Sequence, residues 1–288
     1  MAGSPGRRPI SQTDSSAPSE RRRGLVYGRR KGPKLSAHQS SLRETLLPKL
    51  RLALEHGRDP RSYFQPPPHG EVEARSASGG GPVRGDDPHP KNASHFSSVR
   101  CRYRPPQGGG ESLVDDVWLE IGFGAGEHLL EQARHHPRTG LIGAEPYEGG
   151  VAKLLARLTG AENIRIYEGD AREIIEALPD ASIGRVFILF PDPWPKTRHH
   201  KRRFVQTQTL DALARVLKPG AELRFASDDA GYLAWTLERL IAHPAFAWTA
   251  ERASDWTMRS ADWPQTRYEA KALHGPPVFL RFVRKPIL

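Results

Sequence analysis

The chain has 288 residues, 37% of them hydrophobic, and a formal net charge of +10 at pH 7. No apolar stretch reaches the roughly 18 residues that a membrane helix needs, and residues 1–24 lack the apolar core of a signal peptide, so we expect a cytoplasmic protein without a membrane partner. The single cysteine, Cys101, excludes an internal disulfide framework, and no Cys/His cluster has the spacing of a structural zinc site, so we expect no metal.

The positive charge is concentrated at the start of the chain. Residues 1–34 contain nine Lys or Arg against Asp14 and Glu20, a net +7, which leaves +3 for the other 254 residues. A basic arm of this kind favours a polyanion such as nucleic acid through counterion release, although a merely solvated tail has the same composition. We predict residues 1–34 to be a basic disordered tail.

Two further segments precede the predicted domain. In residues 35–58, Leu42, Leu46, Leu50 and Leu54 recur every four positions, which predicts a short helical segment. Pro48 interrupts this pattern and predicts two short helices or a kink. Residues 59–112 are rich in Pro and Gly, and we predict a flexible insertion without a core.

Strand and helix patterns alternate through residues 113–288, which we predict to form one domain. The predicted strands are residues 117–121, 141–145, 163–167, 185–190, 222–226, 246–248 and 278–283, separated by segments with helical spacing of leucine and isoleucine. One such helix carries Leu210, Leu213 and Leu217 and is predicted to stop at Lys218. This alternation is typical of an α/β fold with a doubly wound, mostly parallel seven-stranded sheet, similar to the Rossmann fold.

Carboxylates follow the first five predicted strands. Each strand ends at or within three residues of an acid: Glu120, Glu145, Asp170, Asp192 and Asp228. An acid at this position often only caps the next helix. Because the carboxyl ends of parallel strands share one edge of the sheet, where open α/β folds bind ligands, five acids there indicate a binding site.

The glycines after the first strand narrow the choice of ligand. Gly122, Gly124 and Gly126 have the spacing G-x-G-x-G, whereas the dinucleotide fingerprint is G-x-G-x-x-G. Glu120 and Glu127 would also surround a diphosphate with negative charge. S-adenosylmethionine, which has a cationic centre and no phosphate, suits these residues better, since its carboxylate can accept from the loop amides. We expect Glu145 to accept from the ribose hydroxyls and Asp170 from the adenine amino group.

A fourteen-residue stretch follows the fourth strand: Phe190-Pro-Asp-Pro-Trp-Pro-Lys-Thr-Arg-His-His-Lys-Arg-Arg203. Its prolines restrict the backbone on both sides of Asp192, at the edge of the sheet where the ligand is expected. The basic residues after it are candidates for phosphate contacts, and Trp194 can stack on a base or simply pack. The stretch therefore predicts an acidic reaction centre beside a nucleic-acid surface.

This stretch closely resembles the signature of the bacterial tRNA (guanine-N7)-methyltransferases, the TrmB family. Residues 119–126 and 266–269 resemble the family as well, and the similarity covers roughly residues 113–284 and a shorter segment over 27–47. Residues 66–111 are longer than the family pattern, and residues 146–150 differ from many members. The resemblance implies a class I methyltransferase fold and methyl transfer from S-adenosylmethionine to N7 of a guanine in the variable loop of tRNA.

The resemblance also implies roles for individual residues. The cofactor would be bound by Glu120, Glu145, Asp170 and Asp192 together with Gly122, Gly124 and Gly126, and Asp192 would also be catalytic. The substrate would be bound by Lys196, Asp228, Thr266, Arg267, Tyr268 and Glu269. The tRNA-contacting loop would contain Arg198, His199, His200, Lys201, Arg202 and Arg203. We expect a monomer or a homodimer.

The chemistry of N7 agrees with this set of residues. Guanine N7 has a free lone pair on the major-groove edge, so no proton has to leave before it attacks a methyl group. The enzyme mainly has to align the reactants, and we expect Asp192 to hold the guanine and to stabilise the positive charge that develops on it.

Two alternatives stay open from the residues alone. Asp192-Pro193-Trp194 partly resembles the D-P-P-Y motif of methyltransferases that act on an exocyclic amine, although Pro195 occupies the place of the aromatic residue. A non-catalytic RNA-binding protein on a methyltransferase scaffold is the other alternative. The acids at positions 120, 145, 170 and 192 argue against it, because a scaffold alone has no need of them.

Overall fold

The computed structural model of the chain describes residues 32–65 and 113–286, except residues 159, 161 and 272. Most of the predicted basic tail and residues 66–112 of the predicted insertion lie outside the described residues.

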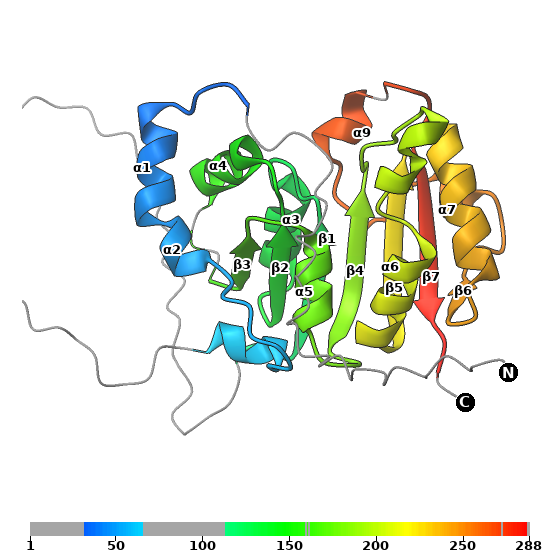
Figure 1. Cartoon of the computed structure of the whole chain (residues 1–288), viewed down its shortest axis with the longest axis horizontal. Coiled ribbons are helices and arrows are strands. Elements are labelled where there is room, and N and C mark those ends of the chain that lie inside the picture. The colour runs from blue at the N-terminus through cyan, green and yellow to red at the C-terminus, as the bar shows by residue number, and fades with distance from the viewer. Residues whose placement is uncertain (1–31, 66–112, 159, 161, 272, 287–288) are drawn as a thin grey trace, which may run out of the picture.

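One seven-stranded sheet organises the described part of the chain (Figure 1). The strands are β1 (Asp116–Ile121), β2 (Thr139–Ala144), β3 (Ile164–Tyr167), β4 (Ile183–Leu189), β5 (Leu217–Ser227), β6 (Phe246–Trp248) and β7 (Val278–Arg284), in the order β3-β2-β1-β4-β5-β7-β6. The first five are parallel, and β7 runs antiparallel between β5 and β6. The predicted doubly wound, mostly parallel sheet is confirmed. Its strand order reverses between β1 and β4, which is where such sheets open a crevice for a ligand.

Helices cover both faces of the sheet. The helices α3 (Glu127–His135) and α4 (Glu148–Arg157) bury Leu129, Leu130, Leu154 and Leu155 in a core on one face. On the other face, seen in front in Figure 1, α5 (Ala171–Ala177), α6 (Thr207–Val216) and α7 (Ala230–Ala242) form the second core with Ile174, Leu210, Leu213 and Leu240. Burying each such side chain stabilises the fold by roughly 1.5–3 kcal/mol. The short helices α8 (Ser254–Thr257) and α9 (Arg267–Lys271) lie between β6 and β7 in the chain.

The N-terminal helical segment divides as its proline predicts. Helix α1 (Ala37–Thr45) begins with a capping box between Ser36 and Gln39, and α2 (Leu47–Leu50) follows after Leu46. Pro48 lies in the first turn of α2, where a helix has no hydrogen bond to lose. Leu54, which the spacing placed in the helical pattern, lies beyond both helices.

The first residues of the expected flexible insertion, 59–112, form an ordered segment. Residues Pro60–Phe64 form the 3₁₀ helix η1, capped by Asp59. Phe64 is 1% exposed, and it packs against Gly140 so closely that a Cβ there would lie 2.4 Å from the Phe64 ring. The beginning of the predicted insertion therefore belongs to the core beneath β2.

One helix boundary was predicted wrongly. Helix α6 ends at Val216, and Leu217 already belongs to β5, which is eleven residues long. Leu217 pairs with Ile183, and the register then shifts before Arg185 pairs with Glu222. The irregularity holds Pro219 and Gly220 within the strand, although their composition is typical of a helix end.

Candidate active site

A pocket of about 380 Å³ lies at the carboxyl ends of the parallel strands, the upper end of the sheet in Figure 1. Its volume lies within the range of roughly 300–1,000 Å³ typical of small-molecule sites. The predicted site residues in its wall are Gly122, Gly124, Glu145, Asp170, Asp192, Arg202 and Tyr268. Residues from four strand ends, the signature loop and α9 thus meet in one pocket.

The glycine loop between β1 and α3 has a backbone that other residues rarely adopt. Gly122, Gly124 and Gly126 have φ values of 74°, 60° and 76°, in the left-handed region that favours glycine. At Gly126, a Cβ would lie 2.4 Å from Leu154 of α4. The three glycines are therefore required by the turn and by the close packing of α3 on α4.

Glu145 follows β2 and carries the most perturbed carboxylate of the pocket. It is 7% exposed, and it accepts hydrogen bonds from the backbone N–H groups of Gly124 and Tyr147, both at 2.8 Å. Burial raises its pKa to about 7, against the effect of these two bonds, and the charges of Asp192 and Glu120 raise it further. No cation among the described residues pairs with this carboxylate, so a cationic or hydroxyl-bearing ligand would stabilise its ionised form.

Asp170 is buried and begins α5. Its carboxylate accepts from the backbone N–H of Arg172 at 3.0 Å and pairs with the Arg172 guanidinium at 3.0 Å. The helix-capping role that such an acid often has is therefore present, and the side chain lines the pocket as well.

The signature loop after β4 is strained on both sides of Asp192. Phe190 and Trp194 have φ values of 49° and 45°, which are rare for bulky residues and typical of strain held at functional sites. Asp192 is exposed in the pocket wall, and partial loss of water there raises the pKa of its carboxyl group. The Trp194 ring, whose packing or stacking was left open, lies 4.8 Å from the Arg202 guanidinium and 5.8 Å from the His199 ring.

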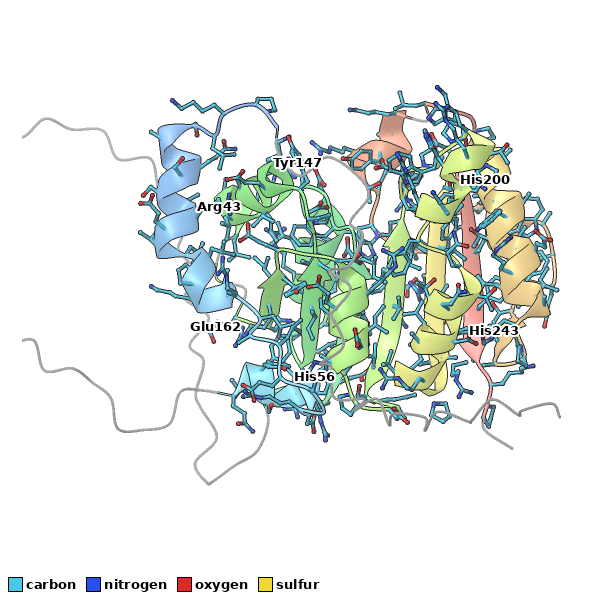
Figure 2. The ribbon with its side chains drawn as sticks, viewed as in Figure 1. Arg43, His56, Tyr147, Glu162, His200 and His243 are labelled. Atoms are coloured by element: carbon cyan, nitrogen blue, oxygen red, sulfur yellow. The ribbon has the colours of Figure 1, made fainter. Side chains whose placement is uncertain are left out.

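The basic residues of the signature form the 3₁₀ helix η2 (Thr197–Arg202). Lys196, Arg198 and Lys201 are exposed, and His200, labelled in Figure 2, packs its ring 5.3 Å from Trp235.

Arg203 is buried, unlike its neighbours in the signature. Its expected role as an RNA contact is therefore corrected. Arg203 is 3% exposed, donates to the carbonyl oxygens of Pro193 at 2.9 Å and Gly231 at 3.3 Å, and lies about 5 Å from the rings of Tyr232 and Trp235. Because its guanidinium is buried among these partners, Arg203 holds the signature loop against α7.

The segment before β7 folds onto the glycine loop. Thr266 caps α9 by accepting from the N–H of Glu269 at 3.2 Å, and Tyr268 packs on Gly124, where a Cβ would lie 3.2 Å from its ring. Arg267 lies 3.7 Å from Glu127, and Glu269 pairs with Arg259 at 3.0 Å. Tyr268 therefore enters the pocket, while Glu269 is engaged with Arg259.

Comparison with known proteins identifies the family. The family described as "Putative methyltransferase" matches residues 115–277. A tRNA (guanine-N(7)-)-methyltransferase of Rhodospirillum rubrum is 44% identical over 269 residues, which cover 90% of this chain and 88% of that protein. A protein of the same name from Brucella anthropi is 41% identical over 266 residues, which cover 91% and 95%. The chain belongs to the tRNA (guanine-N7)-methyltransferase family.

The predicted resemblance, the fold and the assignment as an enzyme are thereby confirmed. Among solved structures, the 16S rRNA methyltransferase KamB is similar, with 16% identity, a TM-score of 0.42, and coverage of 61% of this chain and 90% of that chain.

Two acids predicted for the site of this methyltransferase lie outside the pocket wall. Glu120 is buried, and its carboxylate contacts His128 of α3 at 2.8 Å. Asp228 accepts from the backbone N–H of His274 at 3.1 Å. Sequence reasoning missed Arg172, Phe204 and Tyr147, which line the pocket, and the partner His128; the spacing of these residues carries no signal for such contacts.

No group of three or more His, Cys, Asp or Glu in the described ranges could hold a metal ion. Nor does any helix of the described residues have the length and apolar character to cross a membrane.

Proposed function

We infer that this enzyme transfers a methyl group from S-adenosylmethionine to N7 of a guanine in the variable loop of tRNA. The observation that carries this proposal is the pocket that joins Glu145 and Asp170 with Asp192 of the signature loop. The names of the relatives support tRNA and guanine N7, and the signature's resemblance supports the variable loop.

The pocket fits S-adenosylmethionine. Glu145 is a buried carboxylate whose pKa is raised to about 7, so hydroxyl donors and a nearby positive charge both favour its ionised form. Asp170 offers a second buried acceptor, and Tyr268 covers the glycine loop. When bound, S-adenosylmethionine supplies an electrophilic methyl group. We propose that Glu145 holds its ribose hydroxyls and Asp170 its adenine amino group.

Asp192 would orient the guanine. Because N7 attacks through a free lone pair, the residue needs to fix the base in line with the methyl group and does not need to remove a proton from N7. A carboxylate here can accept from the N1–H and exocyclic amine of guanine, and its charge stabilises the positive charge that develops on the ring. The strained backbone at Phe190 and Trp194 fixes where this carboxylate points.

The exposed residues Lys196, Arg198 and Lys201 would bind tRNA phosphates beside the pocket. We further propose that Thr266 and Arg267 position the substrate and that Asp228 does so from the end of β5. A monomer or a homodimer would carry out this reaction in the cytoplasm, which the single cysteine also favours.

The test is methyl transfer from labelled S-adenosylmethionine to unmodified tRNA, followed by digestion and identification of the labelled nucleoside. We expect 7-methylguanosine. Label in a nucleoside methylated on its exocyclic amine would favour the alternative methyltransferase, and tRNA binding without measurable binding of S-adenosylmethionine would favour the RNA-binding scaffold.

A further inference from the structure

Glu120, the acid at the end of β1, has a buried histidine as its partner. Glu120 is 3% exposed and His128 is 2% exposed, and the Nδ1 atom of His128 lies 2.8 Å from Oε2 of Glu120. An ionised carboxylate only accepts hydrogen bonds, so Nδ1 carries the hydrogen. The ring of Phe187 packs 4.5 Å from the imidazole and helps to exclude water from this pair.

Gln132, one turn further along α3, determines which imidazole nitrogen is protonated. Its Nε2 atom donates to the backbone carbonyl of Asp262 at 2.8 Å and lies 3.4 Å from Nε2 of His128. Because a carbonyl only accepts, the amide nitrogen has to face Asp262, and its second hydrogen then points to His128. The His128 Nε2 atom therefore presents a lone pair, and the imidazole is neutral with its hydrogen on Nδ1.

Asp262 is itself fixed. Its carboxylate pairs with Arg224 at 2.6 Å and with Arg185 at 3.6 Å. Although burial acts in the opposite direction, the bond from Arg224 lowers the pKa of Asp262 to about 2. The next residue, Trp263, is buried and packs 5.3 Å from Phe279 of β7. A chain of hydrogen bonds thus runs from Glu120 through α3 to the anchored start of the segment that carries Thr266 and Tyr268.

The charge of Glu120 reaches the pocket although its side chain does not line it. Ile121, the next residue, is part of the pocket wall, and the Glu120 charge is one of the causes that raise the pKa of Glu145. A neutral imidazole donates to Glu120 without cancelling its negative charge. A protonated imidazole would cancel it.

We propose that His128 and Gln132 are positioning residues that orient the Glu120 carboxylate, so that its charge favours the cationic cofactor over its neutral product. This inference rests on the proposed function, since it concerns how the same site selects S-adenosylmethionine. Without a donor on Nδ1, the buried Glu120 carboxylate loses the hydrogen bond that orients it, and the selectivity for the sulfonium falls.

The test compares calorimetric Kd values for S-adenosylmethionine and for S-adenosylhomocysteine, which lacks the positive charge, using the full-length protein. In His128→Leu, we expect the ratio of the first Kd to the second to rise by at least about fivefold, the size of a lost charge interaction in a partly screened site. In His128→Asn, whose amide can donate in place of Nδ1, we expect the ratio to return towards the wild-type value.

A matched control is available at the opposite end of the sheet. His243, labelled in Figure 2, is buried and pairs at 3.1 Å with Asp211, whose side chain is 66% exposed, so His243→Leu removes another histidine–carboxylate contact far from the pocket. We expect this variant to keep the wild-type ratio.

If His128→Leu does not fold, the Gln132→Leu variant provides the test instead. We expect its ratio of the two Kd values to rise as well. An unchanged ratio, or an equal loss of both affinities, would overturn the positioning role. Wild-type protein that binds neither compound would instead refute the proposed function itself.

Discussion

At the scale of single residues, Glu145 has the property that most distinguishes this pocket. A surface glutamate is ionised at neutral pH, whereas burial raises the pKa of Glu145 to about 7. Above the ordinary glutamate value of 4.5 the unfolded chain loses this proton while the folded protein keeps it, so this residue lowers the stability of the ligand-free protein as the pH rises towards 7. Such a group is typical of a site that is completed by its ligand.

We therefore predict that the affinity for S-adenosylmethionine rises with pH through about 7. Below this pH the free protein holds a proton on Glu145 that the bound state releases, because ribose hydroxyls and the sulfonium favour the carboxylate; the bound state has fewer protons, so higher pH favours binding. Calorimetry at pH 6 in buffers of different ionisation enthalpy measures the released proton. Glu145→Gln is the control, and proton release that persists in it would assign the effect to another group.

At the scale of elements, Arg203 connects the signature loop to α7. Tyr232 completes this contact by accepting from the backbone N–H of Phe204 at 2.9 Å, and Trp235 donates to the carbonyl of Val205 at 2.7 Å. The carboxyl end of the signature therefore packs inside the protein against α7, whereas Lys196, Arg198 and Lys201 face solvent.

This division predicts two different results within one basic stretch. Arg203→Ala removes the donor to the partly buried Pro193 carbonyl, at a cost of about 1–3 kcal/mol, and empties the space beside the rings of Tyr232 and Trp235, so we expect a lower unfolding temperature. Arg198→Ala combined with Lys201→Ala should keep the unfolding temperature and weaken tRNA binding, reducing the slope of log Kd against log salt by ~0.9 for each phosphate that the variant no longer neutralises. An unchanged slope in the double variant would exclude direct phosphate binding by these two side chains.

Helix α1 is attached to the two turns that follow β2 and β3, which carry Glu145 and Asp170, the acids proposed to bind the cofactor. Arg43, which Figure 2 shows on the α4 side of α1, donates to Glu148 at the start of α4 and to Glu168 at 2.6 Å, two residues before Asp170. Its side chain is 22% exposed, whereas Arg51, the other partner of Glu168, is 61% exposed.

We predict that Arg43→Ala increases amide hydrogen exchange in α1 about fivefold, corresponding to about 1 kcal/mol for partly exposed ion pairs, without changing exchange in β4. Arg51→Ala, which removes a single exposed pair, is the matched control and should change exchange less. Equal effects of the two substitutions would contradict the proposed attachment through Arg43.

The same elements illustrate what a sequence can predict. The sheet, the break near Pro48 and the acids at Glu145, Asp170 and Asp192 follow from local patterns, since strand periodicity and strand ends are properties of neighbouring residues. Phe64 beneath Gly140, Arg203 between aromatic rings and His128 on Glu120 depend on residues brought together only by folding. Arg203 was misassigned because a buried and an exposed arginine look the same in a basic run.

At the scale of the whole molecule, basic groups border the acidic pocket. The pocket has acids at its strand ends, Arg172 and Arg202 lie in its wall, and residues 1–34 carry a net +7. Gly32, where the described chain begins, contacts Tyr147, since a Cβ there would overlap the tyrosine ring. The backbone N–H of Tyr147 donates to Glu145 (the tyrosine is labelled in Figure 2), so the chain from the basic arm arrives at the edge of the pocket.

We predict that replacing the basic residues of the arm up to Lys31 with serine weakens tRNA binding and flattens its salt dependence, because fewer counterions are released. The Kd for S-adenosylmethionine should stay at the wild-type value, since the arm's charges are not needed in the pocket. Filter binding of tRNA at several salt concentrations measures the first effect, and calorimetry measures the second. A wild-type salt slope would mean that the arm is a solvated tail.

The most direct test of the whole account is to map the modified base. Unmodified tRNA is incubated with the protein and S-adenosylmethionine and then treated with borohydride and aniline, which cleave the chain at 7-methylguanosine. We predict cleavage at one guanine of the variable loop, and a large loss of cleavage, roughly 10²–10³ in rate, with Asp192→Asn. Methyl incorporation without cleavage would contradict the assignment to N7, and near-wild-type cleavage by Asp192→Asn would contradict the charge role of Asp192.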